Sequence, residues 1–382
     1  MGFALGKRRL AGFGAVLATA LLLGTADRAP AADPNFNSGV TVDQPGAILI
    51  FPKVVFSKGR DTLIQLSNTM NVTAQARCFY IDARLQFPDQ PPGPFNPRAW
   101  SETDFTLFLT RQQPTHWVAS FGRPVDPSDG LGNQNSGIDP GGIPPVTAGF
   151  EGELRCVVVD AGENPIPANW LKGEATIRSL DGDVSNYNAI AIRAGERAGE
   201  TGNTLILDEV GKDTGGQYNS CPDTLLFNFV KYDSPDPVIQ QNGLCVGDNC
   251  PIETSLTLVP CRADFENQIG GQVTVHFDIT DEFETTLSEV TTVQCWYDTD
   301  LNRIGSGGAP TQNSFVTLAS PTGLARITPA DGQGGVLGIA EETHIDSDNN
   351  QARAAFNLQH EGSRATSLPF ENFDRIVLSA PF

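Results

Sequence analysis

Two short segments carry oxygen-bearing side chains at alternate positions, as loops that bind calcium do. Hard cations take several carboxylate and amide oxygens in a tight arc, and the alternate residues of a turn can supply them. Neither segment has the glycine and the bidentate glutamate that complete an EF-hand, and Asp and Asn also dominate ordinary turns. Calcium is therefore the one cofactor that the sequence suggests. Its candidate ligands are Asp346, Asp348 and Asn350 in one segment and Asp298, Asp300 and Asn302 in the other.

Two tryptophans are candidate contacts for a glycan. A protein that binds sugars commonly exposes aromatic rings that stack on the sugar ring, and Trp100 and Trp170 both lie near segments rich in turn residues. Tryptophan also buries a large apolar area in protein cores. The sequence leaves both interpretations open.

The sequence contains none of the common catalytic signatures. It lacks the Gly-x-Ser-x-Gly elbow, the His-Glu-x-x-His zinc motif and the glycine-rich phosphate loop that ends in lysine. Neighbouring acids, as in Glu341 and Glu342, are more typical of solvated strand ends than of a catalytic pair. A site assembled across strands is recognised by geometry alone and stays open. The sequence assigns no catalytic residue and favours a non-enzymatic protein.

The first residues predict export. Lys7, Arg8 and Arg9 precede an apolar run at residues 10–25, and small residues follow at 29–32. This order is that of a signal peptide cleaved near residue 32. No later apolar stretch is long enough to span a bilayer, so we expect no membrane span after cleavage. The net charge of −20 disfavours binding to nucleic acid, because phosphate backbones are also negative.

The composition predicts an all-β protein with an internal repeat. Glycine (39 residues) and proline (27 residues) are abundant, which suits short strands joined by turns. Several blocks alternate apolar and polar residues, as half-buried strands of a β-sandwich do. Similar blocks recur in the same order in both halves of the chain. The matched blocks are residues 48–52 with 256–260, 61–69 with 272–280, 76–80 with 293–297, 105–110 with 315–320, 152–154 with 335–337, and 172–177 with 352–358.

The repeat predicts two tandem β-sandwich domains after the signal peptide at 1–32. Domain one covers residues 40–232 and includes extra strands near 204–207 and 225–230. It also contains two long loops, at 87–98 and 122–149, and loops of such length are either functional or loosely ordered. The bounds of the remaining parts are 233–252 for a linker and 253–382 for domain two.

Seven cysteines in an exported chain predict disulfides. Cys78 and Cys295 are equivalent in the repeat, so the simplest scheme gives each domain one bridge. These bridges are Cys78–Cys156 and Cys261–Cys295. The pairing of the other three cysteines stays open, with one thiol left over: Cys221, Cys245 and Cys250.

The whole pattern resembles immunoglobulin-like or fibronectin-like sandwiches in architecture, although the antibody spacing of Cys, Trp and Cys is absent. With segments such as Gln-Pro-Thr-His-Trp at 113–117 and Leu-Lys-Gly-Glu-Ala-Thr at 171–176, the chain is similar to a group of uncharacterised exported bacterial proteins. That resemblance covers most of the mature chain and implies no activity or site residue.

The function expected from the sequence is that of a non-enzymatic structural, adhesive or binding protein of the periplasm, cell surface or extracellular space. Its partner would be a protein or a glycan. The alternative is a secreted carbohydrate-binding or hydrolytic protein with a site built from loops. The sequence does not identify the ligand or the oligomeric state.

Overall fold

The computed structural model describes residues 39–87, 96–124, 141–195, 202–208, 217–231, 234–235, 251–305, 313–346, 348, 350–364 and 374–380. The signal peptide expected at residues 1–32 lies outside them. None of the described helices has the length and apolar character needed to cross a membrane.

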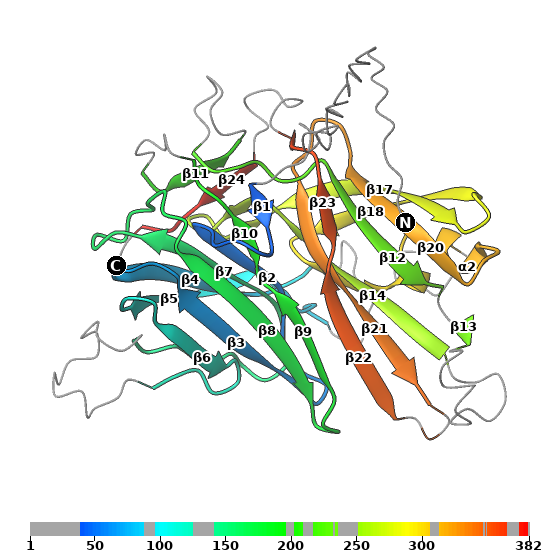
Figure 1. Cartoon of the computed structure of the whole chain (residues 1–382), viewed down its shortest axis with the longest axis horizontal. Coiled ribbons are helices and arrows are strands. Elements are labelled where there is room, and N and C mark those ends of the chain that lie inside the picture. The colour runs from blue at the N-terminus through cyan, green and yellow to red at the C-terminus, as the bar shows by residue number, and fades with distance from the viewer. Residues whose placement is uncertain are drawn as a thin grey trace, which may run out of the picture. The chain divides into compact units, whose positions relative to one another are not determined.

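The described chain is nearly all β, which confirms the predicted fold class (Figure 1). The first half forms a sandwich whose two layers are joined by one hairpin. β2 and β3 pair only at the hairpin itself, through Phe56 with Asp61 and Ser57 with Arg60. One layer has the order β5-β4-β7-β2, with β10 and β1 beyond β2, and the other contains β6, β3, β8 and β9. The strands are β1 (Val40–Thr41), β2 (Ile48–Ser57), β3 (Arg60–Asn68), β4 (Ala74–Asp82), β5 (Ser101–Leu109), β6 (Pro114–Val118), β7 (Phe150–Val159), β8 (Leu171–Ser179), β9 (Val184–Asn188) and β10 (Ile190–Ile192).

The second half also forms a sandwich. One layer has the order β13-β14-β21-β22, with β19 on the other side of β14, and the second has the order β18-β17-β20-β12-β23. Apolar residues of both layers, among them Leu258, Phe277 and Ile327, form its core. A small sheet is formed by β11, β24, β15 and β16, and its buried residues pack in a core with β2, β4 and β7. The elements are β11 (Thr204–Leu207), β12 (Thr224–Val230), β13 (Ser234–Pro235), β14 (Pro251–Pro260), β15 (Ala263–Asp264), β16 (Ile269–Gly270), β17 (Gln272–Asp281), β18 (Thr286–Gln294), β19 (Tyr297–Asp300), η2 (Leu301–Arg303), α2 (Ser314–Thr317), β20 (Thr322–Pro329), β21 (Val336–Ile345), β22 (Gln351–Asn357), β23 (Gln359–Glu361) and β24 (Asp374–Val377).

Two strands belong to a different half from the one predicted. The sequence placed β11 and β12 in the first domain, yet β12 pairs with β20 and β23, and β11 pairs with β24. The alternating apolar residues of β12 enter the second core, where Phe227 and Phe229 are buried. By hydrogen bonding these two strands therefore belong with strands of the second half, and residues 35–382 pack as one compact unit.

One pair of strand partners occupies equivalent positions in the two expected repeats, whereas another expected block differs in secondary structure. Phe51 lies opposite Leu154 in the first half, and the matched residues Val259 and Leu337 lie opposite each other in the second. In contrast, residues 315–320 were expected to form a strand, but they begin inside α2. The tandem, immunoglobulin-like relation between the halves stays a prediction.

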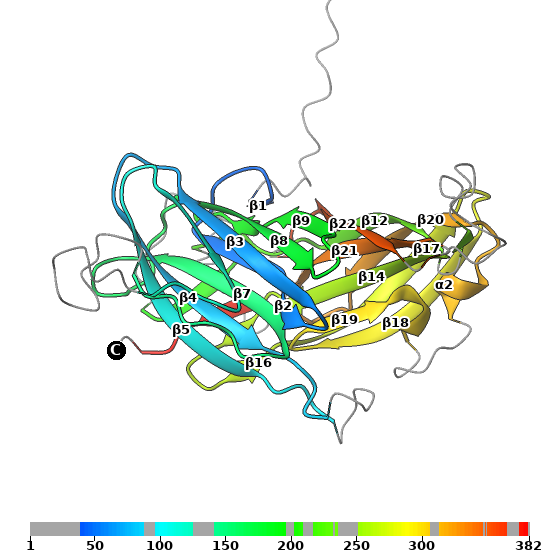
Figure 2. The same ribbon diagram turned by 90° about the horizontal axis from the view of Figure 1, so that it is seen from below.

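The halves share a third core between them. β2 of the first half lies next to β14 of the second (Figure 2). Ile50, Phe79 and Val157 point out of the first sandwich and pack with Val259 and Leu337 of the second half in this core. β2, β4 and β7 are thus buried on both faces, and burial extends along most of each strand.

Candidate functional site

A cavity of about 620 Å³ lies along β5 in the first sandwich. Its volume falls within the range of about 300–1,000 Å³ that small-ligand sites occupy. One wall is β5, and the other is a pair of short segments that meet at residues 123–124 and 141–144. The lining residues are Thr103, Asp104, Phe105, Thr106, Phe108, Arg123, Pro124, Gly141, Gly142, Ile143, Pro144 and Glu163.

β5 is the terminal strand of its layer, and in the described part of the chain it pairs with β4 alone. The Cys78–Cys156 disulfide shows which of its backbone groups face outward. The Cα atoms of Cys78 and Cys156 are 4.0 Å apart, as in a pair of opposite residues that exchange no backbone hydrogen bonds. The backbone groups of Cys78 must therefore face β5, where they meet Phe105. Because backbone direction alternates along a strand, the N–H and C=O groups of Asp104 and Thr106 face the free edge.

The wall opposite β5 is a short antiparallel ladder. Arg123 and Ile143 exchange both backbone hydrogen bonds, each of 2.8 Å. The Arg123 side chain donates to the hydroxyl of Thr115. A Cβ atom placed on Gly141, whose φ is +90°, would lie 3.1 Å from the carbonyl oxygen of Thr106. Gly141 therefore lies close to the edge of β5 at Thr106, and the cavity lies between β5 and this ladder.

Carboxylates follow the outer face of β5 at alternate positions. Asp104 accepts two hydrogen bonds from the guanidinium of Arg77, at 2.6 and 3.2 Å. The Thr106 hydroxyl donates to Glu163 at 2.8 Å, so Glu163 continues the row that Glu102 and Asp104 begin. Burial, and then the charge of Asp104, raise the pKa of Glu102 to about 7. The edge of β5 is thus bordered by negative charge.

The described lining of the cavity combines apolar groups with hydroxyls and charges. It contains the hydroxyls of Thr103 and Thr106 but no Ser, Cys, His or Lys among the described residues. It does include two carboxylates, Asp104 and Glu163, each already held by a neighbouring side chain. Polar edge groups and a few fixed charges are what a ligand site needs for orientation.

In the first calcium candidate, both carboxylate oxygens of Asp346 already accept hydrogen bonds from within the same loop. One carboxylate oxygen of Asp346 accepts from the backbone N–H groups of Asp348 and Asn350, and the other accepts from the Asn350 side chain. This is an Asx turn between β21 and β22. To bind calcium there, Asp346 must give up these bonds, so calcium at this loop stays a prediction.

The second candidate is engaged by cations and hydroxyls of the protein. Asp298 accepts from Lys53 at 3.0 Å and from the Thr257 hydroxyl at 2.6 Å. Asp300 forms an ion pair with Arg303 at 3.7 Å, and burial raises the pKa of Asp300. Asn302 is buried in η2. The two Asp side chains lie close enough to interact, and after burial the charge of Asp298 raises the pKa of Asp300 further.

Both candidate glycan tryptophans are partly buried. The Trp100 ring stacks on Phe265, with ring centroids 5.7 Å apart, and Trp170 packs against the first core. Neither lines the cavity along β5. A role for Trp100 or Trp170 in glycan binding stays a prediction.

One of the two expected disulfides is present and the other is replaced. Cys78–Cys156 forms across β4 and β7, as predicted. Cys261 bonds to Cys221 instead of Cys295, so the Cys261–Cys295 prediction is wrong. The reason is that β12 joins the second half and carries Cys221 to the end of β14. Cys295 is a half-buried thiol whose pKa burial raises to about 11. Two further cysteines lie outside the described residues: Cys245 and Cys250.

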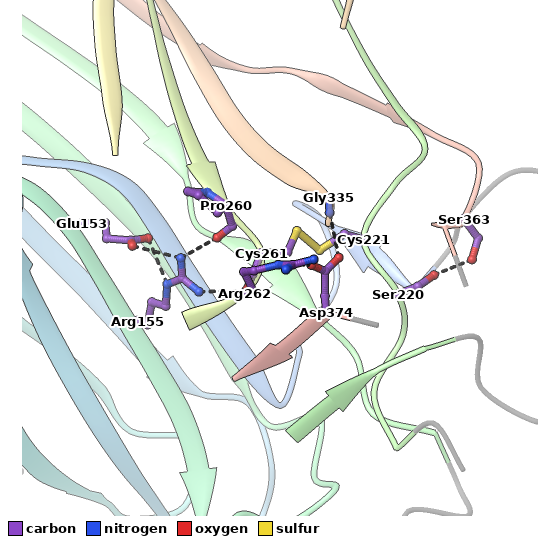
Figure 3. Close-up of a disulfide and its surroundings, with 10 residues drawn as sticks. All are labelled: Glu153, Arg155, Ser220, Cys221, Pro260, Cys261, Arg262, Gly335, Ser363 and Asp374. Carbon is purple, nitrogen blue, oxygen red and sulfur yellow. Dashed lines mark hydrogen bonds and ion pairs between the residues drawn. A yellow bond between two sulfur atoms is a disulfide. The ribbon is translucent and has the colours of Figure 1, made fainter. Parts of the chain in front are cut away.

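Figure 3 shows the Cys221–Cys261 bridge beside buried charges. Arg155 forms an ion pair with Glu153 at 2.9 Å and donates to the backbone carbonyls of Pro260 and Cys261. Both charged side chains are about 1 % exposed. Because the ion pair is on β7 and the carbonyls end β14, this contact fastens the first half to the second.

The carboxylate of Asp374 lies next to the Cys221–Cys261 disulfide. Within the described residues, Cys221, Cys261 and Asp374 bring three potential metal-binding atoms within 4.8 Å of one another. The two sulfurs are bonded to each other, so neither is available as a thiolate. Asp374 instead accepts from the backbone N–H of Gly335 at 2.8 Å. With the disulfide formed, the cluster joins its segments through the Cys221–Cys261 bond and the Arg262–Asp374 ion pair.

A second buried charge cluster joins the two halves at the bulge of β2, where Lys53 pairs with acidic residues of the second half. Proline cannot donate a ladder hydrogen bond, and the register of β2 shifts between Phe51 and Val54, around Pro52. There the Lys53 ammonium contacts Asp298 at 3.0 Å and Glu341 at 3.2 Å. Arg60 and Ser185 also donate to Glu341. Burial would raise the pKa of Glu341, but Lys53, Arg60 and Ser185 lower it to about 2.

Sequence reasoning missed the residues that line the cavity. It identified a strand at residues 105–110 and a long loop at 122–149, but it could not place one against the other. Glu163 follows β7 in a turn with φ of +62°, and nothing in its local sequence links it to Thr106. The richness of the 122–149 loop in Gly and Pro was the one available signal.

Comparisons with known proteins add no name to this geometry. No model of a protein family matches the chain, and no curated protein matches it closely enough to be counted as a relative.

Proposed function

We propose that this chain is a non-enzymatic exported binding protein of the periplasm, cell surface or extracellular space, and that its ligand binds in the cavity along β5. The observation that carries this proposal is the cavity itself, which is bounded by a strand edge with unpaired backbone groups and by fixed charges. Export is supported by the signal-like residues at 1–32 and is compatible with the two disulfides.

The scaffold supports a preorganised site. β5 is anchored to β4 over its whole length, and β4 is joined to β7 by the Cys78–Cys156 bond. Arg77, which holds Asp104, is about 1 % exposed and also donates to the carbonyl of Ser379. A rigid wall of this kind lowers the entropic cost of binding.

The test is to follow the protein through fractions of the native host, as wild type and with the cavity filled. Thr103 is exposed and lines the cavity, so Thr103→Trp occupies space without disturbing the core. Thr286→Trp, at an exposed position of β18, is the matched control. We expect wild type and the control to be retained on the envelope or in the pellet and Thr103→Trp to be released. Equal retention of all three would contradict the proposal that the cavity binds the ligand.

A carbohydrate-active protein is the second candidate, because Asp104 and Glu163 line one cavity and glycoside hydrolysis uses two carboxylates. A panel of polysaccharides assayed for released reducing ends tests it. Hydrolysis that is lost in both Asp104→Asn and Glu163→Gln would favour this candidate over the binding protein.

A further inference from the structure

We propose that the free edge of β5 binds an extended, lysine- or arginine-bearing peptide segment of a partner protein, which adds to the sheet as one more strand. This proposal rests on the proposed function, since it names the ligand class of the same cavity.

The backbone of β5 is the first reason. Asp104 and Thr106 direct their N–H and C=O groups to the outer edge, and no backbone hydrogen bond from the rest of the described chain reaches them, although Gly141 lies close to the Thr106 carbonyl. An extended segment satisfies such groups in the way that an added strand does. The cavity follows the edge from Thr103 to Phe108, which is the direction in which a strand would lie.

Two unpaired carboxylate oxygens are the second reason. Oε2 of Glu163 and Oε2 of Glu102 are shielded from solvent and accept no hydrogen bond from the described residues. Buried acceptors without a donor are costly, so a ligand that supplies donors gains affinity from them. A cationic side chain on the outer face of the added strand would supply both donors and charge.

Other occupants fit less well. Sugars commonly stack on Trp or Tyr, and the lining contains neither. A second copy of this chain, paired β5 to β5, would place the acidic rows of Glu102 and Asp104 on one continuous sheet without adding a cation. The net charge of −20 also favours a basic partner over an acidic one.

The test uses a fluorescent synthetic peptide of alternating lysine and valine, titrated against the full mature protein by fluorescence anisotropy. Two versions carry N-methyl groups on every second amide, one version on the lysines and one on the valines. Both keep the charge, so they separate strand pairing from general attraction to an acidic protein. We expect one N-methylated version to lose binding by tenfold or more and the other to bind nearly as the parent does.

The charge contribution is tested with protein variants. Glu163→Gln should lower the affinity for the parent peptide about tenfold, in line with the loss of one charge-assisted hydrogen bond. Glu284→Gln, at an exposed position of the β17–β18 turn, is the control and should leave binding unchanged. A peptide with glutamate in place of lysine should not bind.

Equal binding of both N-methylated peptides and the parent would overturn the strand model. So would equal binding of the glutamate peptide. If the peptides fail to bind while Thr103→Trp still abolishes retention on the envelope, the ligand class is wrong and the proposed binding function stands. If retention is also unaffected by Thr103→Trp, both proposals fail.

Discussion

Removing the charge of Glu341 should destabilise the protein strongly, because this carboxylate is about 4 % exposed and is held by two cations. Its pKa is about 2, against an ordinary value of 4.5. At about 1.4 kcal/mol for each pKa unit, this difference corresponds to about 3 kcal/mol of stability at neutral pH. Glu341→Gln also leaves Lys53 buried with less compensation, and breaking a buried ion pair costs about 3–5 kcal/mol.

The pH dependence has a defined sign. Because the folded pKa of Glu341 is depressed, its contribution is fully present above about pH 4.5 and is lost as the pH falls toward 2. Wild type should therefore lose stability in this window, and Glu341→Gln should lose less. The two proteins should be closer in stability at pH 2.5 than at pH 7.

Urea unfolding of the mature protein, followed by tryptophan fluorescence at both pH values, measures these differences. Glu342→Gln is the matched control, since the neighbouring Glu342 is partly exposed and its ion pair with His344 is 3.8 Å long. A Glu341→Gln protein within about 1 kcal/mol of wild type at pH 7, or an unchanged pH difference, would refute the assignment of this cluster as a stabilising junction.

Three further outcomes are expected. Replacing Cys78 and Cys156 by serine opens a loop with a sequence separation of 78 and should lower the free energy of unfolding by roughly 4 kcal/mol, measured by urea titration. Arg155→Met should cost about 3–5 kcal/mol because it leaves Glu153 buried and unpaired, whereas Arg155→Met with Glu153→Leu should recover most of the loss in the same assay. Glu102→Gln should raise the melting temperature at pH 8 but not at pH 5: the pKa of this acid is raised, so its ionisation opposes folding as pH increases from about 4.5 through about 7.

Local patterns predicted the strands better than they predicted the partners of each strand. β3 and β17 alternate buried and exposed residues, and the same alternation is visible in the sequence at 61–69 and 272–280. Phe315 shows the limit, since a short apolar run reads alike in a strand and in the helix α2. There Asn313 caps the helix by accepting from the backbone N–H of Val316, and the run alone does not reveal this contact.

Long-range pairing accounts for most of what the sequence could not predict. Cys261 could be paired with any other cysteine on spacing alone, and the outcome depended on where β12 inserted. The candidate site depended on the same kind of information. Its parts lie at Thr106, Arg123 and Glu163, which only the folded chain brings to one cavity.

The insertion of β12 between β20 and β23 has a consequence for how the chain can be divided. A fragment that begins at the predicted boundary, residue 253, would lack a strand from the middle of its own sheet. Expressed alone, it would expose the edges of β20 and β23 and should aggregate. A chain cut once between residues 236 and 250 would keep β12 with the first fragment, and the Cys221–Cys261 disulfide together with the pairing of β12 would then hold the two fragments together. A fragment that begins before residue 204 would keep β12 but would still lose the core and the buried ion pairs that the two halves share, so the chain is best expressed whole.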